Sequence, residues 1–276
     1  MRKPEIFVLW FGKQTSFFPF WIKSIEKNQG IFRWKIFSDQ KLTESKYIES
    51  KLISRNDLKR AVESLTGGKI RIDINSTNFS RKCCDYRLLL PLIFGNPSSS
   101  HWGWCDTDLI FGDISRTLSN SLEVAEVIST HPGRLSGPFS MLAPKHFKDF
   151  VINNMQSISE KRYLNTDESS TWFQKAYSSS MNVFDDASIL QPTRGPDALK
   201  LKDTCAVWNN GQLSVKTSKG YVSSFMVHFG KLKGHRRFWV DQDSVTTNTW
   251  YCNRNGIYKT NSLLLNLAKK LFNNML

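Results

Sequence analysis

The stretch Trp102–Ile114, which reads WGWCDTDLIFGDI, constrains the fold of this chain more than any other. Asp106 and Asp108 are two positions apart, so in an extended segment both carboxylates lie on the same face. The apolar residues on either side favour a strand that is buried on both faces. Two like charges are rarely buried together unless a cation joins them. The stretch therefore predicts a divalent metal at the end of a central strand, although a polar turn with both carboxylates in water would also give this pattern.

The first hundred residues alternate between strand and helix patterns. Short apolar or alternating runs favour strands, and apolar residues spaced three and four apart favour helices. Such an alternation predicts a mostly parallel central sheet in a three-layer α/β domain. We expect strands at 5–10, 31–37, 52–53, 70–74 and from 102 onward, and helices at 17–28, 55–65 and 80–94.

The second half of the chain has a less regular pattern, and we expect an irregular C-terminal half. Asn210-Gly211 favours a hairpin turn, and no segment reaches the length of a membrane span. No linker rich in Pro, Gly or Ser divides the chain. We expect strands at 135–142 and 222–229, a hairpin at 208–213, helices at 145–155 and 169–177, and a basic amphipathic helix at 263–276.

The formal net charge of +14 favours an anionic partner, such as a nucleic acid, an anionic lipid or a phosphorylated substrate. Because the basic residues are spread along the chain and not massed in one tail, the nucleic-acid interpretation is weakened. The number of cysteines is five, and no two of them have CxxC spacing. The odd number argues against a disulfide framework, and the missing CxxC pair argues against a zinc site. Cysteines of this kind are typical of a reducing cytoplasm.

Several polar residues follow the predicted strands. Phe11-Gly12, Asp39 and the Asp106/Asp108 pair stand at strand ends, where open α/β sheets gather their ligands. His228 also follows an apolar strand, and it could ligate Mn²⁺ or be an ordinary structural histidine.

Three more groups of charged residues could carry chemistry or be structural. Lys231, shortly after His228, could bind phosphate as a point charge or lie in a solvated turn. Lys82, Asp85 and Arg87 share one predicted helix. Lys82 and Arg87 could contact a diphosphate or sugar hydroxyls, or the group could form an ion pair on an ordinary helix surface. The adjacent Asp185 and Asp186 could line a sugar pocket or favour a helix N-terminus.

The order of these motifs resembles that of bacterial glycosyltransferases with the GT-A fold. More distantly, the chain is similar to the group of glycogenin and the lipopolysaccharide galactosyltransferases, through Tyr86-Arg87-Leu88 and residues 228–233. The resemblance extends over residues 5–240. The segments that carry it are Trp10-Phe11-Gly12, Lys82-Cys83-Cys84-Asp85-Tyr86, Trp102–Asp113, Phe184-Asp185-Asp186 and His228–Lys231.

The resemblance implies one Rossmann-like GT-A domain over residues 1–258, followed by the amphipathic helix at 259–276. It also implies that Mn²⁺ or Mg²⁺, held by Asp106, Asp108 and His228, bridges the diphosphate of a nucleotide sugar. Asp185 and Asp186 would be the catalytic pair, with Asp185 as a positioning group or a nucleophile. The donor would bind to Phe11, Gly12, Asp39, Lys82, Asp85, Arg87, Asp106 and Lys231.

The implied activity is hexosyl transfer with retention, from a nucleotide sugar of the UDP type to a glycan or lipid-linked glycan. We expect this reaction in cell-surface polysaccharide or lipopolysaccharide synthesis, at the cytoplasmic face of a membrane. The C-terminal helix could contact that membrane or pack on the core of the protein. Two other functions stay open: a metal-dependent nucleotidyltransferase or phosphate-ester hydrolase, and a basic nucleic-acid-binding protein.

Overall fold

The computed structural model describes residues 2–42, 45, 48–179, 181–185, 206–217, 220–230, 239–253 and 256–259. Asp186, Lys231 and the predicted C-terminal helix at 263–276 lie outside the described residues. No helix within the described ranges has both the length and the apolar character needed to cross a membrane.

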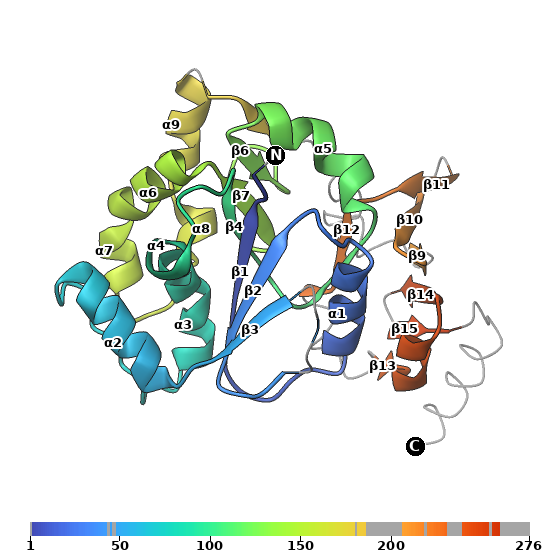
Figure 1. Ribbon diagram of the computed structural model, residues 1–276, viewed down its shortest axis with the longest axis horizontal. Helices are drawn as coiled ribbons and strands as arrows, with labels where there is room; N and C mark the ends of the chain where they lie inside the picture. The colour runs from blue at the N-terminus through green and yellow to red at the C-terminus, as the bar shows by residue number, and fades with distance from the viewer. Residues whose placement is uncertain are drawn as a thin grey trace.

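Seven strands form the central sheet (Figure 1), in which neighbouring strands are parallel except where they pair with β7. The predicted mostly parallel sheet is therefore confirmed. In spatial order the strands are β3 (Ile48–Leu52), β2 (Arg33–Ser38), β1 (Glu5–Trp10), β4 (Trp102–Cys105), β7 (Phe139–Leu142), β6 (Val127–Ser129) and β8 (Val183–Phe184).

Helices cover both faces of this sheet, which confirms the predicted three-layer α/β arrangement (Figure 1). Successive side chains of β1 point to opposite faces, so Phe7 and Leu9 enter one core while Ile6 and Val8 enter the other. The first core is closed by α2 (Arg55–Thr66), α3 (Phe79–Tyr86), η1 (Arg87–Leu89), α4 (Leu90–Phe94), α6 (Pro144–Asn153), α7 (Met155–Ser159) and α9 (Trp172–Ser178), and the second by α1 (Phe18–Glu26) and α5 (Ile114–Val124).

The expected strand between Ile70 and Ile74 is wrong. Ile70 and Ile72 are buried in the core, so the alternation has a structural cause, but the segment pairs with no strand in the described part of the chain. Side chains satisfy its backbone instead, because Thr66 Oγ1 accepts from the Ile70 amide and Arg55 Nη1 donates to the Ile74 carbonyl. The alternating pattern thus corresponds to an irregular segment that side chains anchor.

The helix expected at 80–94 is broken into α3, η1 and α4. Pro91 lies in the first turn of α4, where its missing N–H costs least, and its ring prevents a continuous helix. The break places Arg87 at the start of η1, at a change of helix geometry.

The expectation of an irregular C-terminal half is wrong for the described residues from 206 onward. Asn210 and Gly211 have φ of 48° and 96°, the left-handed conformations of a type I′ hairpin turn, as their sequence predicts. They join the first two strands of a second, six-stranded sheet. In spatial order it comprises β11 (Gly220–Ser223), β10 (Gln212–Thr217), β9 (Ala206–Asn209), β14 (Thr249–Asn253), β15 (Gly256–Tyr258) and β13 (Trp239–Val240).

The second sheet packs on α1 through aromatic side chains. Trp208 and Trp250 stack with ring centroids 3.8 Å apart, and Phe20 of α1 meets Trp250 edge to face at 4.9 Å. Trp208 Nε1 donates to the Phe111 carbonyl at 2.9 Å. Phe111 belongs to β5 (Leu109–Phe111), which follows the Asp pair, so the second sheet is tied directly to the candidate metal-binding segment.

Asn28 ties the end of α1 to the start of α5, and this contact gives a test of the fold. Its Nδ2 donates to the carbonyls of Ser24 and Gly112, and its Oδ1 accepts from the Ile114 amide at 2.7 Å. In Asn28→Ala the buried groups of Gly112 and Ile114 lose their partner, so we expect a loss of about 2–4 kcal/mol in the free energy of unfolding, measured with urea.

Asn153→Ala is the matched control, because Asn153 is exposed and bonds only to Asp149 of its own helix. We expect it to change the free energy of unfolding by less than about 0.5 kcal/mol. Equal effects of the two substitutions would show that Asn28 does not hold these elements together.

Candidate metal centre

The chain leaves the central sheet through Asp106, Thr107 and Asp108. The Asp106 amide donates to the Pro138 carbonyl at 2.9 Å, which extends the pairing of β4 with β7 by one step. The Asp106 side chain is 28% exposed and that of Asp108 is 3% exposed. The prediction of two carboxylates at the end of a central strand is confirmed, and the alternative of a turn with both in water is wrong because Asp108 is buried.

Strand pairing brings His228 to this pair. β12 (Met226–His228) runs antiparallel to β5 with His228 opposite Leu109, and the Phe229 amide donates to the Asp108 carbonyl at 3.0 Å. His228 Nε2 lies 3.4 Å from Asp108 Oδ1 and 3.9 Å from Asp106 Oδ2. The two acids and the imidazole, 120 positions apart in the sequence, therefore converge.

The three residues could hold a metal ion, since each offers one ligand atom and these atoms all lie within 4.8 Å of one another. Two carboxylates with one imidazole suit a cation that accepts both oxygen and nitrogen ligands, such as Mn²⁺. The donor set therefore fits the predicted metal.

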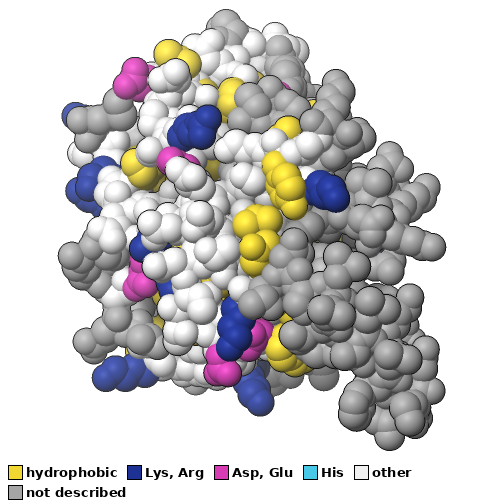
Figure 2. Space-filling model, turned by 90° about the vertical axis from the view of Figure 1, so that its right-hand side faces the viewer, with side chains coloured by type: hydrophobic (Ala, Val, Ile, Leu, Met, Phe, Trp, Pro, Cys, Tyr) yellow, Lys and Arg dark blue, Asp and Glu magenta, His cyan; other side chains and the backbone are white. Residues whose placement is uncertain are grey.

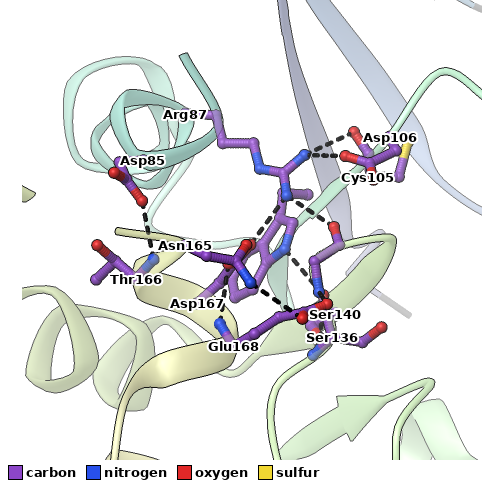
Figure 3. Close-up of polar contacts among 12 residues, drawn as sticks. Asp85, Arg87, Cys105, Asp106, Ser136, Ser140, Asn165, Thr166, Asp167 and Glu168 are labelled. Atoms are coloured by element: carbon purple, nitrogen blue, oxygen red, sulfur yellow. Dashed lines mark hydrogen bonds and ion pairs between the residues drawn. The ribbon is translucent and has the colours of Figure 1, made fainter. Parts of the chain in front are cut away.

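Arg87 reaches the same centre from η1 and is 5% exposed (Figure 3). Its Nη1 bonds to Asp106 Oδ1 at 2.6 Å. Its Nη2 bonds to Asp167 Oδ2 at 2.9 Å and donates to the Gly137 carbonyl at 2.7 Å. Both ends of the guanidinium are thus occupied by the protein, and one oxygen of Asp106 is committed to it.

The charges in this network influence one another. Burial by itself would lower the pKa of Arg87, but the carboxylates of Asp106 and Asp167 raise it well above its usual value. Burial raises the pKa of Asp167 to about 6, although the Arg87 guanidinium opposes that shift. Arg87 therefore stays charged at any physiological pH, and Asp167 is ionised near neutrality.

Two predicted donor-binding residues meet at the carboxyl ends of β1 and β2. Asp39 Oδ1 accepts from the Gly12 amide at 3.0 Å, and Trp10 Nε1 donates to the Gly12 carbonyl at 3.0 Å. Phe11 is buried, with its ring edge to face with Phe79 at 5.3 Å. The contact between Gly12 and Asp39 was not foreseen, and their donor-binding roles stay predictions.

Lys82 and Asp85 form an ion pair of 2.8 Å, but both are buried rather than on a helix surface. Asp85 also accepts from the amides of Leu164 and Thr166, at 3.3 and 2.9 Å. These contacts anchor the segment before α8 (Thr166–Ser169) to α3. A donor-binding role for either side chain stays a prediction.

Asp185 follows β8, and its Oδ2 accepts from the Gly133 amide at 2.8 Å. β4 and β6 are both antiparallel to β7, and β8 is parallel to β6, so β4, β6 and β8 run in the same direction. Asp185 and Asp106 therefore lie at the same end of the sheet, where these strands have their carboxyl ends. Its catalytic role stays a prediction, as do the catalytic role of Asp186 and the donor-binding role of Lys231, both outside the described residues.

Sequence reasoning missed Asp167, which lies in a TDES segment without a recognisable motif. A buried arginine needs carboxylate partners, but the sequence did not show that Arg87 was buried. It also missed Gly230, where an added Cβ would lie 3.0 Å from Cε1 of the His228 ring. A glycine two positions after a histidine gives no signal of such a contact.

The family model described as "Family of unknown function (DUF6625)" matches residues 6–275, so the chain belongs to this family. No curated protein matches the chain. Among solved structures, the chain is similar to the apo-form glycosyltransferase GlyE of Streptococcus pneumoniae TIGR4, with a TM-score of 0.37 and 8% sequence identity. The similarity covers 67% of this chain and 46% of that chain, so this chain spans less than half of that protein's length.

The buried ion pair between Arg87 and Asp167 gives a stability prediction. In Arg87→Met, Asp167 is left as a buried carboxylate without its cation, so we expect a loss of about 3–5 kcal/mol in the free energy of unfolding at neutral pH. In the double variant Arg87→Met/Asp167→Asn that charge is absent, and we expect most of the loss to be recovered. Urea denaturation measures both. A double variant no more stable than Arg87→Met would show that the loss has another cause.

The contact of Gly230 with His228 predicts an effect on metal binding. In Gly230→Ala the new methyl group displaces the His228 ring, so we expect Mn²⁺ affinity to fall by about 10-fold in a titration. Gly67→Ala is the control, because Gly67 has a φ of 57° with no atom within 4 Å of an added Cβ. Gly67, at the end of α2, also has a positive φ, and equal Mn²⁺ affinities of the two variants would contradict the prediction.

Proposed function

We propose that this chain is a metal-dependent glycosyltransferase that moves a hexosyl group from a nucleotide sugar to a glycan acceptor. The observation that carries the proposal is the convergence of Asp106, Asp108 and His228 at the carboxyl end of β4. The contact between Gly12 and Asp39 at the ends of β1 and β2 supports it, since ligands of open α/β sheets bind along this edge.

The residues around the proposed metal site would have separate roles. Asp106, Asp108 and His228 would hold Mn²⁺ or Mg²⁺, and the bound cation would act as a Lewis acid on the departing nucleoside diphosphate. Asp108, being buried, is shielded from water, which strengthens its attraction for a cation. Arg87 holds Asp106 by its Oδ1 and leaves Oδ2 on the side of His228.

The donor would lie at the end of the central sheet where the parallel strands have their carboxyl ends. We place its nucleobase or ribose near Asp39 and Gly12 and favour UDP as the nucleotide. Lys231 would add positive charge at the diphosphate. Phe11, Lys82, Asp85 and Arg87 would complete the proposed donor side.

Asp185 would stand at the reaction centre with Asp186. It would either position the reacting sugar or attack it as a nucleophile, and the second role would give a retaining reaction in two displacements. Its place at the same sheet edge as Asp106 supports this assignment.

The acceptor would be a glycan or lipid-linked glycan in cell-surface polysaccharide or lipopolysaccharide synthesis at the cytoplasmic face of a membrane. The net charge of +14 suits attraction to phosphorylated donors and anionic lipid headgroups. We divide the chain into a catalytic domain, 1–258, and a C-terminal helix, 259–276, which could contact that membrane.

The alternatives have less support. Nucleotidyltransferases and phosphate-ester hydrolases often use two metals, whereas the described residues contain a single cluster of metal-ligating groups. For nucleic-acid binding, one basic surface is expected. On the face that Figure 2 shows, the described Lys and Arg side chains lie apart, some of them beside acidic ones.

Release of free nucleoside diphosphate tests the proposal. The purified chain is incubated with Mn²⁺ and a panel of UDP-hexoses and other nucleotide sugars, and we expect turnover of at least one donor that EDTA abolishes. Asp108→Asn removes a metal ligand, so we expect turnover of that donor to fall by at least about 100-fold.

Asp243→Asn is the control, since Asp243 is exposed in η3 (Gln242–Thr246) of the C-terminal region. We expect it to keep the full rate. Undiminished turnover by Asp108→Asn, or turnover that persists in EDTA, would end the proposal. Release of nucleoside monophosphate and sugar phosphate in place of nucleoside diphosphate would favour a phosphate-ester hydrolase.

A further inference from the structure

We propose that Asp167 is a positioning residue of the metal centre, which acts through Arg87 to turn one oxygen of Asp106 toward the cation. The inference rests on the metal site of the proposed function and not on its donor or acceptor. Asp167 is 1% exposed, so it would act without touching a substrate.

Arg87 can transmit this effect because its guanidinium is planar and rigid. Asp167 Oδ2 and the Gly137 carbonyl fix Nη2, at 2.9 and 2.7 Å. With Nη2 fixed, the plane of the group sets where Nη1 points. Nη1 bonds to Asp106 Oδ1 at 2.6 Å.

Asp106 needs this support more than Asp108 does. Its side chain is 28% exposed, and the terminal torsion of an aspartate is broad, so packing alone does not choose which oxygen faces the metal. With Oδ1 held by Arg87, Oδ2 lies on the side of His228, 3.9 Å from Nε2. The bond from Arg87 therefore selects the metal-facing oxygen.

Asp167 is itself held in place. Its Oδ1 accepts from the Glu168 amide at 2.9 Å, and Glu168 Oε1 accepts from the Gly137 amide at 3.1 Å (Figure 3). The preceding residue, Thr166, is anchored through its amide to Asp85. The short α8 is thus fastened to α3 and to the loop before β7, so Asp167 has a defined position from which to orient Arg87.

Mn²⁺ binding by the full chain tests the inference without any nucleotide sugar. Free Mn²⁺ is measured by electron paramagnetic resonance during titration of wild type and Asp167→Asn. We expect about 10-fold weaker binding in the variant, the usual effect of losing a residue that orients a metal ligand. Asparagine keeps the size and shape of the aspartate side chain and removes its negative charge, and urea denaturation checks that the variant is folded.

Glu5→Gln is the matched control. Glu5 is a buried carboxylate that pairs with Lys35 at 2.9 Å and accepts from the Asn96 amide, at the amino end of β1, opposite the metal centre. The substitution makes the same chemical change and lowers stability without touching Arg87. We expect the Mn²⁺ affinity of Glu5→Gln to equal that of wild type, and a loss as large as that of Asp167→Asn would mean that the effect is general destabilisation.

A double-mutant cycle separates positioning from the simple loss of a nearby negative charge. If Asp167 acts through Arg87 on Asp106, Asp167→Asn weakens Mn²⁺ binding little further once Asp106→Asn is present. An effect of the same size in both backgrounds would overturn the inference in favour of long-range electrostatics.

The failures of the two proposals are distinguishable. Wild-type affinity in Asp167→Asn overturns the positioning role and leaves the glycosyltransferase proposal standing. Absence of Mn²⁺ binding by wild type overturns both. Mn²⁺ binding that depends on Asp167, without turnover of any nucleotide sugar, supports this inference and counts against the proposed reaction.

Discussion

The buried guanidinium of Arg87 is the interaction on which the candidate site depends. It joins four parts of the chain that are far apart in sequence: η1, the end of β4 at Asp106, the loop at Gly137 and α8 at Asp167. A charge buried this deeply needs strong partners, and Asp106, Asp167 and the Gly137 carbonyl supply them at Nη1 and Nη2, so these segments are held to one arrangement. The break of the helix expected at 80–94 therefore matters for the candidate site, since it places Arg87 at the start of η1.

The position of His228, the third candidate metal ligand, depends on a different constraint, which is the register of β5 against β12. Ile110 and Val227 point into the core shared with the second sheet, while Phe111 and Met226 point into the core under the central sheet. A slip of one residue would exchange these faces and turn His228 away from Asp108. The second sheet thus contributes to the site by fixing a register, and the contact of Trp208 with Phe111 reinforces it.

The central sheet and the Asp pair could be predicted because hydrophobic pattern reports burial directly, and the placement of His228 beside the pair agreed with the resemblance to glycosyltransferases. The segment from Ile70 to Ile74 failed because alternation reports which residues are buried and not which backbone groups pair. The second sheet was missed because its strands are short and separated along the chain. Asp167 could not be found, since nothing local marks a carboxylate whose partner lies 80 positions away.

The charges of the described site explain why a divalent cation would suit it. Arg87 carries one positive charge, and Asp106, Asp108 and Asp167 carry three negative charges when ionised, so two of these charges are then uncompensated. Holding two uncompensated charges close together in a partly buried site would be costly, and a doubly charged ion among Asp106, Asp108 and His228 would balance them. On this argument Arg87 does more than orient Asp106: by cancelling the charge of Asp167, it leaves the centre with the charge that one Mn²⁺ or Mg²⁺ neutralises.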